Sequence, residues 1–588
     1  MSIQNAKIDW QNWSAEALAQ AEREGKPILL AITATWCHWC HVMDRTTFEN
    51  EEVVRIINEQ FIPIQADNDR RPDLNTRYNM GGWPTVALLT PKGDILTGAT
   101  YIPPGQMIDL LNRVQEIYNQ ERDELVLRAE AMRISQQEEL ERETQATVIL
   151  NDNISANVMR SIEGTFDPMY GGFGGQQKFP HVPVLEFLFS SYRRTGNLSH
   201  LEMAVQTLDS MRQGGIYDPV EGGFFRYSTT RDWSIPHYEK MLEDNSGLLA
   251  VYILAYNVTG DESYLEVARE ISSYLENTLM AVPEGAFFGS QDAVEEYYQL
   301  DKEEREKRTP PSVDKTIYTN WNAMAADAYL KAYEATGDTS FKKTGLGVLE
   351  YIINSCRKND GFYHYCDPLP HEPSMLTDQV WAGTAFLRAY ECTGSRRYLD
   401  AAREAADHII SSYQDPNGGF YDITEDRRMN ERLPNREKLL DENANVARFL
   451  NRLSYYAHEA SYRKSAELAL RSLARVYDAY GILAAPYALA VSEFLSEPVR
   501  IAVAGSMDDP RTQSLLESSL QAKSPSSIVE TLGEDVSEEE LQELGLESTD
   551  PPQASVCARE ICRSTGDPDQ LWKAIHEFEK WSETQKGE

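Results

Sequence analysis

The sequence has little cysteine, little positive charge and no long apolar segment. Seven cysteines among 588 residues is a small and odd number, which indicates a reducing compartment. Apolar runs such as PILLAI at 27–32 are far too short to span a bilayer. The first residues, MSIQNAKIDWQNWSAE, lack the basic region and apolar core of a secretory signal. We therefore predict a cytoplasmic protein that has no membrane partner.

Positive charge is scarce, because 56 Lys and Arg residues face 93 Asp and Glu residues and give a formal net charge of −37. Nucleic acid phosphates need a basic protein face, and anionic membranes repel an acidic one, so both partners are excluded. We predict neither a cofactor nor a metal ion. Neutral or cationic ligands remain compatible with this charge.

The length is too great for a single core, and the residue pattern changes along the chain. Strand and helix patterns alternate over 1–120, which predicts an α/β domain. We expect a linking helix over 121–150, an all-α region over 151–496 and a small α/β domain over 497–588. Within the first part we expect a helix over about 105–118.

A repeat runs through the all-α region. In four copies a Gly ends one helix in the left-handed conformation, the next residue caps a second helix, and a bulky side chain follows. The copies are RTGNLSHLE (194–202), VTGDESYLE (258–266), ATGDTSFKK (335–343), CTGSRRYLD (392–400) and the degenerate HEASYRKSA (458–466). The opposite connections carry glycine and aromatic residues, as in GGFFRY (222–227). We predict an (α/α)6 toroid closed on itself, with an open helical solenoid as the alternative.

The segment Cys37-His38-Trp39-Cys40 follows a predicted strand and opens a predicted helix. At a helix N-terminus Cys37 would favour the thiolate, and Cys40 would lie on the same face to resolve a mixed disulfide. We interpret the pair as catalytic cysteines at a solvent-reachable helix tip, with His38 nearby to assist binding. A zinc site with His38 or His41 and an inert thiol pair are the alternatives.

The segment Gly81-Gly82-Trp83-Pro84-Thr85 precedes another predicted strand. A cis proline there would hold an extended substrate backbone beside the disulfide, so Trp83 and Pro84 are predicted to bind substrate. The element order matches a thioredoxin fold.

The densest polar loop of the all-α region is GGFFRYSTTRDWSIPHYEKMLEDN. Sugar chemistry needs an acid and a base across a ring, with aromatic platforms beside them. We therefore predict catalytic roles for His237, Glu239 and Asp244. The predicted substrate-binding residues of this region are Tyr227, Asp218, Trp233 and Trp321. The alternative is that these side chains cap helices and seal the mouth of the toroid.

Several long motifs resemble those of the family that includes spermatogenesis-associated protein 20. They are TATWCHWCHVM, FDPMYGGFGGQQKFPHVPVLEFL and DKTIYTNWNAMAADAYLKA. The resemblance implies a thioredoxin-like domain followed by an (α/α)6 domain similar to six-hairpin glycosidases and N-acylglucosamine 2-epimerases. The chain departs from the family at Gln291, where an acidic residue is usual. It also has Ala31 at the place of the buried Asp of ordinary thioredoxins.

Three functions remain open at this point. The first is a thiol–disulfide oxidoreductase or redox-sensing module with a protein thiol or disulfide partner. The second is a sugar epimerase, isomerase or glycosidase acting in the toroid, and the third is a non-catalytic scaffold. Of the remaining cysteines, Cys557 and Cys562 are candidates for a second pair, and the others are expected to be buried or loop thiols.

Overall fold

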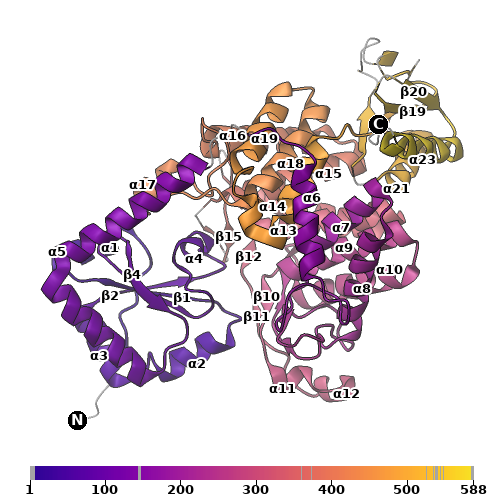
Figure 1. Cartoon of the computed structure of the whole chain (residues 1–588). Helices are drawn as coiled ribbons and strands as arrows, with labels where there is room; N and C mark the ends of the chain where they lie inside the picture. The colour runs from indigo at the N-terminus through magenta and orange to yellow at the C-terminus, as the bar shows by residue number, and fades with distance from the viewer. Residues whose placement is uncertain are drawn as a thin grey trace.

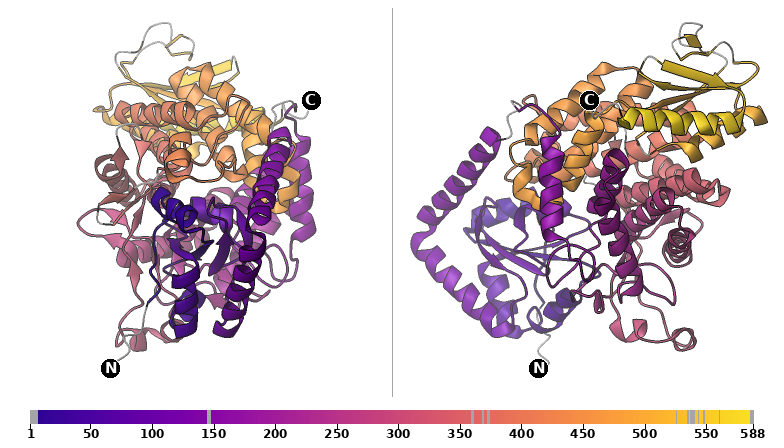
Figure 2. Two further views of the ribbon diagram at one scale, coloured as in Figure 1. Left: turned by 90° about the vertical axis from the view of Figure 1, so that its left-hand side faces the viewer. Right: turned by 45° about the vertical axis from the view of Figure 1, so that its right-hand side comes forward.

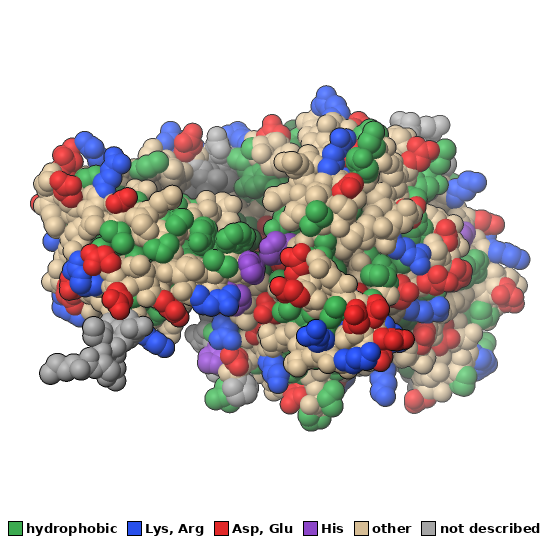
Figure 3. Space-filling view, turned by 90° about the horizontal axis from the view of Figure 1, so that it is seen from below, with side chains coloured by type: hydrophobic (Ala, Val, Ile, Leu, Met, Phe, Trp, Pro, Cys, Tyr) green, Lys and Arg blue, Asp and Glu red, His purple; other side chains and the backbone are tan. Residues whose placement is uncertain are grey.

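The computed structural model shows three parts in a row (Figure 1): an N-terminal α/β domain, a large helical body and a C-terminal α/β domain. It describes residues 7–584 apart from 144–147, 359–360, 368, 372–373, 525, 534–535, 537–540, 543, 547–548 and 560. No described helix has the length and apolarity needed to cross a membrane. Acidic side chains are spread over the face of the helical body in Figure 3.

The N-terminal sheet has the strand order β2-β1-β3-β4, with β1 and β2 parallel and the other pairs antiparallel. Its strands are β1 (Ile28–Thr33), β2 (Ile62–Asp67), β3 (Thr85–Leu89) and β4 (Ile95–Ala99). Apolar side chains fill both faces of β1, so helices must cover both sides of the sheet. The helices are α1 (Ala15–Glu24), α2 (His38–Thr46), α3 (Glu51–Gln60) and α4 (Pro72–Tyr78). This is a thioredoxin-like arrangement, as the sequence predicted.

The helix expected over about 105–118 and the predicted linking helix meet at a kink. Helix α5 runs from Pro104 to Glu143 as one element, with a non-helical backbone at Glu121 (φ −129°). The predicted linking helix is therefore its continuation beyond a kink, because no Gly or Pro interrupts the pattern. In Figure 1 it runs along the outer edge of the N-terminal domain towards the helical body.

The helical body is a closed toroid, which confirms the prediction. Within the described residues, each of six inner helices packs against the next, and the last returns to the first. The inner helices are α7 (Val182–Thr195), α9 (Leu242–Thr259), α13 (Thr319–Thr336), α15 (Leu376–Thr393), α18 (Leu440–Ala457) and α20 (Ala485–Phe494). The outer helices are α8 (Leu198–Gln213), α10 (Glu262–Tyr274), α14 (Thr339–Ser355), α16 (Arg396–Tyr413), α19 (Ala460–Leu473) and α6 (Asn153–Thr165).

The repeat sets the short turns of this ring. Gly196, Gly260, Gly337 and Gly394 have φ between 65° and 70° and end the inner helices as predicted. The caps Asn197, Asp261 and Asp338 accept bonds from the following backbone, whereas Ser395 makes no side-chain capping bond. In the degenerate copy His458 takes the left-handed position (φ 53°).

All the long loops lie at the other end of the ring, where the inner helices begin. They contain short strands, among them β5 (Tyr227–Ser228), β6 (Pro236–His237), β7 (Lys240–Met241), β12 (Ile317–Tyr318) and β15 (Tyr365–Cys366). The N-terminal domain is docked on these loops, as the views in Figure 2 show. One well-shielded link between the two domains is the ion pair between Arg77 and Asp422, at 2.8 Å.

The C-terminal domain repeats the topology of the N-terminal one. Its sheet order is β18-β17-β19-β20, again with the first pair parallel and the other pairs antiparallel. The elements are β17 (Arg500–Ala504), α21 (Pro510–Ala522), β18 (Ile528–Leu532), β19 (Gln553–Ala558), β20 (Ile561–Thr565) and α23 (Pro568–Thr584). The predicted small α/β domain is thus a second thioredoxin-like sheet. It carries no cysteine in Gly505–Asp509, the loop that corresponds to the Cys37 loop.

Candidate functional site

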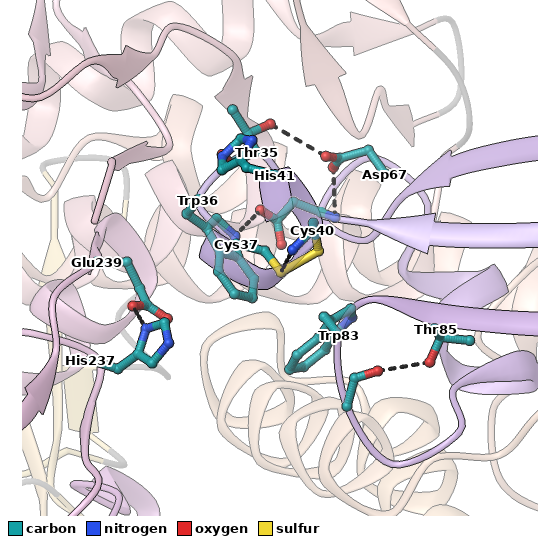
Figure 4. Close-up of a disulfide and its surroundings, with 12 residues drawn as sticks. Thr35, Trp36, Cys37, Cys40, His41, Asp67, Trp83, Thr85, His237 and Glu239 are labelled. Atoms are coloured by element: carbon teal, nitrogen blue, oxygen red, sulfur yellow. Dashed lines mark hydrogen bonds and ion pairs between the residues drawn. A yellow bond between two sulfur atoms is a disulfide. The ribbon is translucent and has the colours of Figure 1, made fainter. Parts of the chain in front are cut away.

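A disulfide joins Cys37 and Cys40 across the first turn of α2 (Figure 4). Cys37 is the N-cap residue, and its sulfur accepts a hydrogen bond from the backbone N–H of Cys40 at 3.2 Å. Free N–H groups and the helix dipole at this end stabilise a thiolate on Cys37 after reduction. The Trp83–Pro84 peptide bond is cis, as expected, and lies in the loop that leads into β3.

The expectation of a solvent-reachable pair is wrong. Cys37 is 4% exposed and Cys40 is 2% exposed, and both belong to an apolar cluster that continues into the toroid. The same cluster includes toroid residues more than a hundred positions away, which no local motif reveals. His38 and Trp39, between the cysteines, are the exposed residues of the turn.

Trp36 connects the disulfide to a buried carboxyl group. Its indole N–H donates to Asp69 Oδ2 at 2.7 Å. Burial, reinforced by the charge of Asp67, raises the pKa of Asp69 to about 7. Asp69 lies in the loop after β2, in the docking face of the domain, and its backbone oxygen bonds His364 Nε2 of the toroid at 2.8 Å.

Arg226 of the toroid lies at the joint between the two domains. Its guanidinium carbon is 4.0 Å from the ring centre of Trp36 and 5.2 Å from that of Trp83. The same side chain approaches Glu239 at 3.9 Å. One cation therefore faces the aromatic residues beside the disulfide and a carboxylate of the predicted toroid site.

The structure brings together three of the predicted toroid residues. His237 Nδ1 bonds the carboxylate of Glu239, and the ring of Tyr227 stacks on His237 at 5.1 Å. Phe179 stacks on the other side of Tyr227 at 4.6 Å. Because the carboxylate engages Nδ1, proton exchange with a ligand would fall to Nε2. Figure 4 shows this pair on the toroid side of the disulfide.

Other predicted residues are occupied by the protein itself. Asp218 accepts from Lys240 at 2.7 Å and from Arg305 at 2.8 Å, and the three side chains are buried. Trp233 is completely buried and donates to the backbone of Tyr170, so its indole offers no surface to a ligand. Trp321 is 6% exposed and packs against Tyr318. These contacts agree with the alternative stated from the sequence, in which such side chains seal the mouth of the toroid.

A cavity of about 640 Å³ runs inside the ring. Acidic residues from the first turns of two inner helices line its mouth: Glu243, Asp244, Asp441 and Glu442. Glu243 is exposed to the cavity, and desolvation by the surrounding ring, with the charge of Asp244, raises its pKa to about 8. Burial also raises the pKa of Asp244 to about 6, although Arg226 opposes it. The pKa values of Asp441 and Glu442 are raised by burial too.

Of these four residues, only Asp244 was predicted. Acidic residues in a first turn are common because they complement the helix dipole, so the sequence does not distinguish those that point into a cavity. The carboxyl oxygens Asp244 Oδ2 and Glu442 Oε2 are buried without a hydrogen-bond partner among the described residues. Such groups are typical of sites that wait for a ligand or for water.

The opposite end of the cavity is lined by arginines that are paired with carboxylates of the protein itself. Arg448 bonds Glu493 at 2.9 Å, Arg452 pairs with Glu391 at 2.7 Å, and Arg388 pairs with Asp327. These pairs neutralise the floor and leave the unpaired carboxyl groups at the mouth. In the part of the chain that the structure describes, no three His, Cys, Asp or Glu side chains form a group that could hold a metal ion.

The fold and site define a thioredoxin-like domain fused to a closed helical toroid. Residues 1–137 match the family described as "Protein of unknown function, DUF255", and residues 284–471 match "Glycosyl hydrolase family 76". These matches and the relatives below confirm the resemblance seen in the sequence motifs.

The chain is 38% identical to spermatogenesis-associated protein 20 of Mus musculus over 49% of its length, but covers only 39% of that protein. An uncharacterized protein of Caenorhabditis elegans is 29% identical, with 70% of this chain and 64% of that protein covered. Among solved structures, cellobiose 2-epimerase from Spirochaeta thermophila is 16% identical with a TM-score of 0.46. That alignment covers 55% of this chain and 84% of the epimerase.

Proposed function

We propose that Cys37 and Cys40 perform thiol–disulfide exchange at the mouth of the toroid. The observation that carries this proposal is the disulfide itself, closed over the first turn of α2 with Cys37 as the N-cap. In the reduced protein, the Cys37 thiolate attacks a substrate disulfide and releases one thiol. Cys40 then attacks the Cys37 sulfur, re-forms the disulfide and releases the second thiol, so two electrons pass to the substrate.

The cover over the pair limits the substrate. Cys37 is only 4% exposed, and the aromatic residues beside it are held by Arg226 of the toroid. A large folded protein has little access to such a sulfur, whereas a small or extended disulfide has more. We therefore assign small-molecule or unfolded peptide disulfides as the substrate class.

The test compares two substrates on the reduced full chain. Oxidised glutathione should re-form the Cys37–Cys40 bond faster than insulin does, measured by alkylation of the remaining thiols and mass spectrometry. Cys40→Ser should trap glutathione on Cys37, and Cys37→Ser should trap none there. The matched control is Cys392→Ser, which removes a buried thiol of the toroid away from the Cys37 site. Exchange by Cys37→Ser at the wild-type rate would disprove the proposal.

A second function is favoured by the carboxyl groups at the cavity mouth. The cavity volume of about 640 Å³ is that of a small-ligand site. Groups with pKa values of about 8 and about 6, as for Glu243 and Asp244, are respectively mainly protonated and mainly ionised near neutral pH. Such a pair provides an acid and a base, which sugar chemistry requires. The match to a glycosyl hydrolase family supports a polyhydroxylated ligand.

In this function a protonated Glu243 donates a proton to a ligand oxygen, and an ionised Asp244 accepts one. A panel of mono- and disaccharides should raise the melting temperature of the full chain. Glu243→Gln and Asp244→Asn should lose that shift, whereas Glu202→Gln on outer helix α8 should keep it. The absence of a shift with every sugar would contradict this function and leave the thiol chemistry untouched.

A further inference from the structure

Two cysteines outside the Cys37 site touch each other inside the toroid. The sulfur atoms of Cys356 and Cys366 are 3.6 Å apart, and the residues are 0% and 3% exposed. Cys356 is the C-cap of α14, and Cys366 belongs to β15. Ten positions of chain separate them, so the contact is made by the fold rather than by a local motif.

The two thiols are chemically unequal. The hydrogen bond between them, with a second one from Tyr351, lowers the pKa of Cys366. The same bond, with burial, raises the pKa of Cys356. Cys366 is therefore the better nucleophile, and Cys356 is the thiol held beside it to resolve an oxidised sulfur.

We propose that Cys356 and Cys366 form a further redox site, beyond the disulfides Cys37–Cys40 and Cys557–Cys562, and that a small hydroperoxide converts this pair to a disulfide. The Cys366 thiolate attacks the peroxide oxygen, breaks the O–O bond and becomes a sulfenic acid while hydroxide or an alkoxide leaves. The Cys356 sulfur then attacks the Cys366 sulfur, and water leaves as the S–S bond forms. Two electrons pass from the thiols to the hydroperoxide, and an added dithiol returns them.

The site lies under the loop that holds the thioredoxin-like domain. His364, two residues before Cys366, bonds the backbone oxygen of Asp69 at 2.8 Å. Asp367, the next residue, pairs with Arg70 at 2.6 Å. A covalent bond at Cys366 therefore ties the base of this docking loop to the end of α14.

A lone buried thiol provides the internal comparison. Cys392 is also fully buried, but its sulfur faces Glu334 Oε1 at 3.7 Å rather than another sulfur. Burial, with the charge of Glu334, raises its pKa well above the ordinary value. Cys392 therefore has neither the activation nor the resolving partner that the pair has.

The experiment treats the full chain with hydrogen peroxide, blocks free thiols under denaturing conditions and digests with trypsin. Cleavage at Arg and Lys puts Cys356 in TGLGVLEYIINSCR and Cys366 in a separate peptide that begins at Asn359. The expected result is a joined species of these two peptides, lighter by two hydrogens and abolished by dithiothreitol. The Cys392 peptide, AYECTGSR, should remain alkylated.

Cys366→Ser and Cys356→Ala should each abolish the joined species, and Cys392→Ser should leave it unchanged. The wild-type digest needs no variant, so a folding defect in a variant does not affect the main result. Two findings would overturn the proposal. One is that both thiols stay free under conditions that oxidise a reference dithiol. The other is that each is overoxidised without ever joining its neighbour. Neither finding bears on Cys37 and Cys40, which lie in other peptides.

Discussion

The guanidinium of Arg226 lies 4.0 Å from the ring centre of Trp36, so a toroid side chain rests on the residue that precedes Cys37. A cation over an indole ring contributes about 0.5–2 kcal/mol, more when it is shielded from water. The same guanidinium approaches Glu239 at 3.9 Å. Arg226 therefore contacts both the aromatic residue beside the disulfide and a carboxylate of the predicted toroid site.

Arg226→Ala should make the disulfide easier to reduce. If opening of the joint limits access, loss of about 0.5–2 kcal/mol should raise the rate of reduction by dithiothreitol roughly 2- to 30-fold. Thiol alkylation followed by mass spectrometry measures that rate. Arg55→Ala, on the exposed face of α3, is the control and should behave as the wild type. An unchanged rate in Arg226→Ala would show that the joint does not protect the disulfide.

The buried ion pair between domains should carry much more energy than pairs on the surface. Arg77 and Asp422 are almost completely shielded, and Arg77 also donates to the backbone oxygen of Asn435 at 2.8 Å. Removing one member leaves the other charge buried, which costs about 3–5 kcal/mol. Arg77→Ala should therefore lower the free energy of unfolding by about that amount in urea denaturation.

The matched comparison is Arg55→Ala, which breaks exposed pairs with Glu52 and Glu59. Exposed pairs contribute about 0–1 kcal/mol, so this variant should unfold almost as the wild type does. Equal losses in Arg77→Ala and Arg55→Ala would mean that the domain interface is open to water in solution.

Local features of the fold could be read from the sequence because a few adjacent residues determine them. Gly260 ends helix α9 because it adopts the left-handed conformation that commonly terminates a helix, and glycine takes this conformation readily. Cys37 caps α2 because it stands where a strand meets a helix. The closed ring followed from the repeat of such hairpins.

Features that depend on contacts between distant segments could not be predicted from the sequence. Cys37 lies in an apolar cluster shared with the toroid, and Arg226 of the toroid lies over the neighbouring Trp36, which no pattern near the cysteines indicates. Glu243 and Asp441 look like ordinary first-turn acids until the ring points them into a cavity. The second thioredoxin-like sheet was missed because its Gly505–Asp509 loop has none of the residues that make the first one recognisable.

His364 should make the domain joint sensitive to alkaline pH. Its Nδ1 faces the Asp378 carboxylate at 2.9 Å and its Nε2 faces the Asp69 backbone oxygen at 2.8 Å. Both partners accept, so both nitrogens donate and the ring is cationic. Burial alone would lower the pKa of His364, but Asp378 outweighs burial and the net pKa is raised.

A raised histidine pKa stabilises the folded state fully below the unfolded value, about 6.5, and this contribution is lost as pH rises through the folded value. The stability advantage of the wild type over His364→Gln should therefore shrink between mildly acidic and alkaline pH. Thermal denaturation over that range measures it, with the exposed His576→Gln as control. A constant difference across the range would mean that His364 is neutral in the folded protein.

Glu243→Gln should stabilise the protein, and more so as pH rises. An unfolded glutamate has a pKa of about 4.3, whereas burial raises that of Glu243 to about 8. Between these values the folded protein holds a proton that the unfolded chain has released, so the wild type loses stability as pH increases. A glutamine has no proton to lose.

The melting temperature of Glu243→Gln should therefore exceed that of the wild type at pH 8 and approach it near pH 4.5. Glu202→Gln should show no such trend, because its carboxylate lies on an outer helix and not in the cavity inside the ring. Parallel trends in the two variants would place Glu243 in water rather than inside the ring.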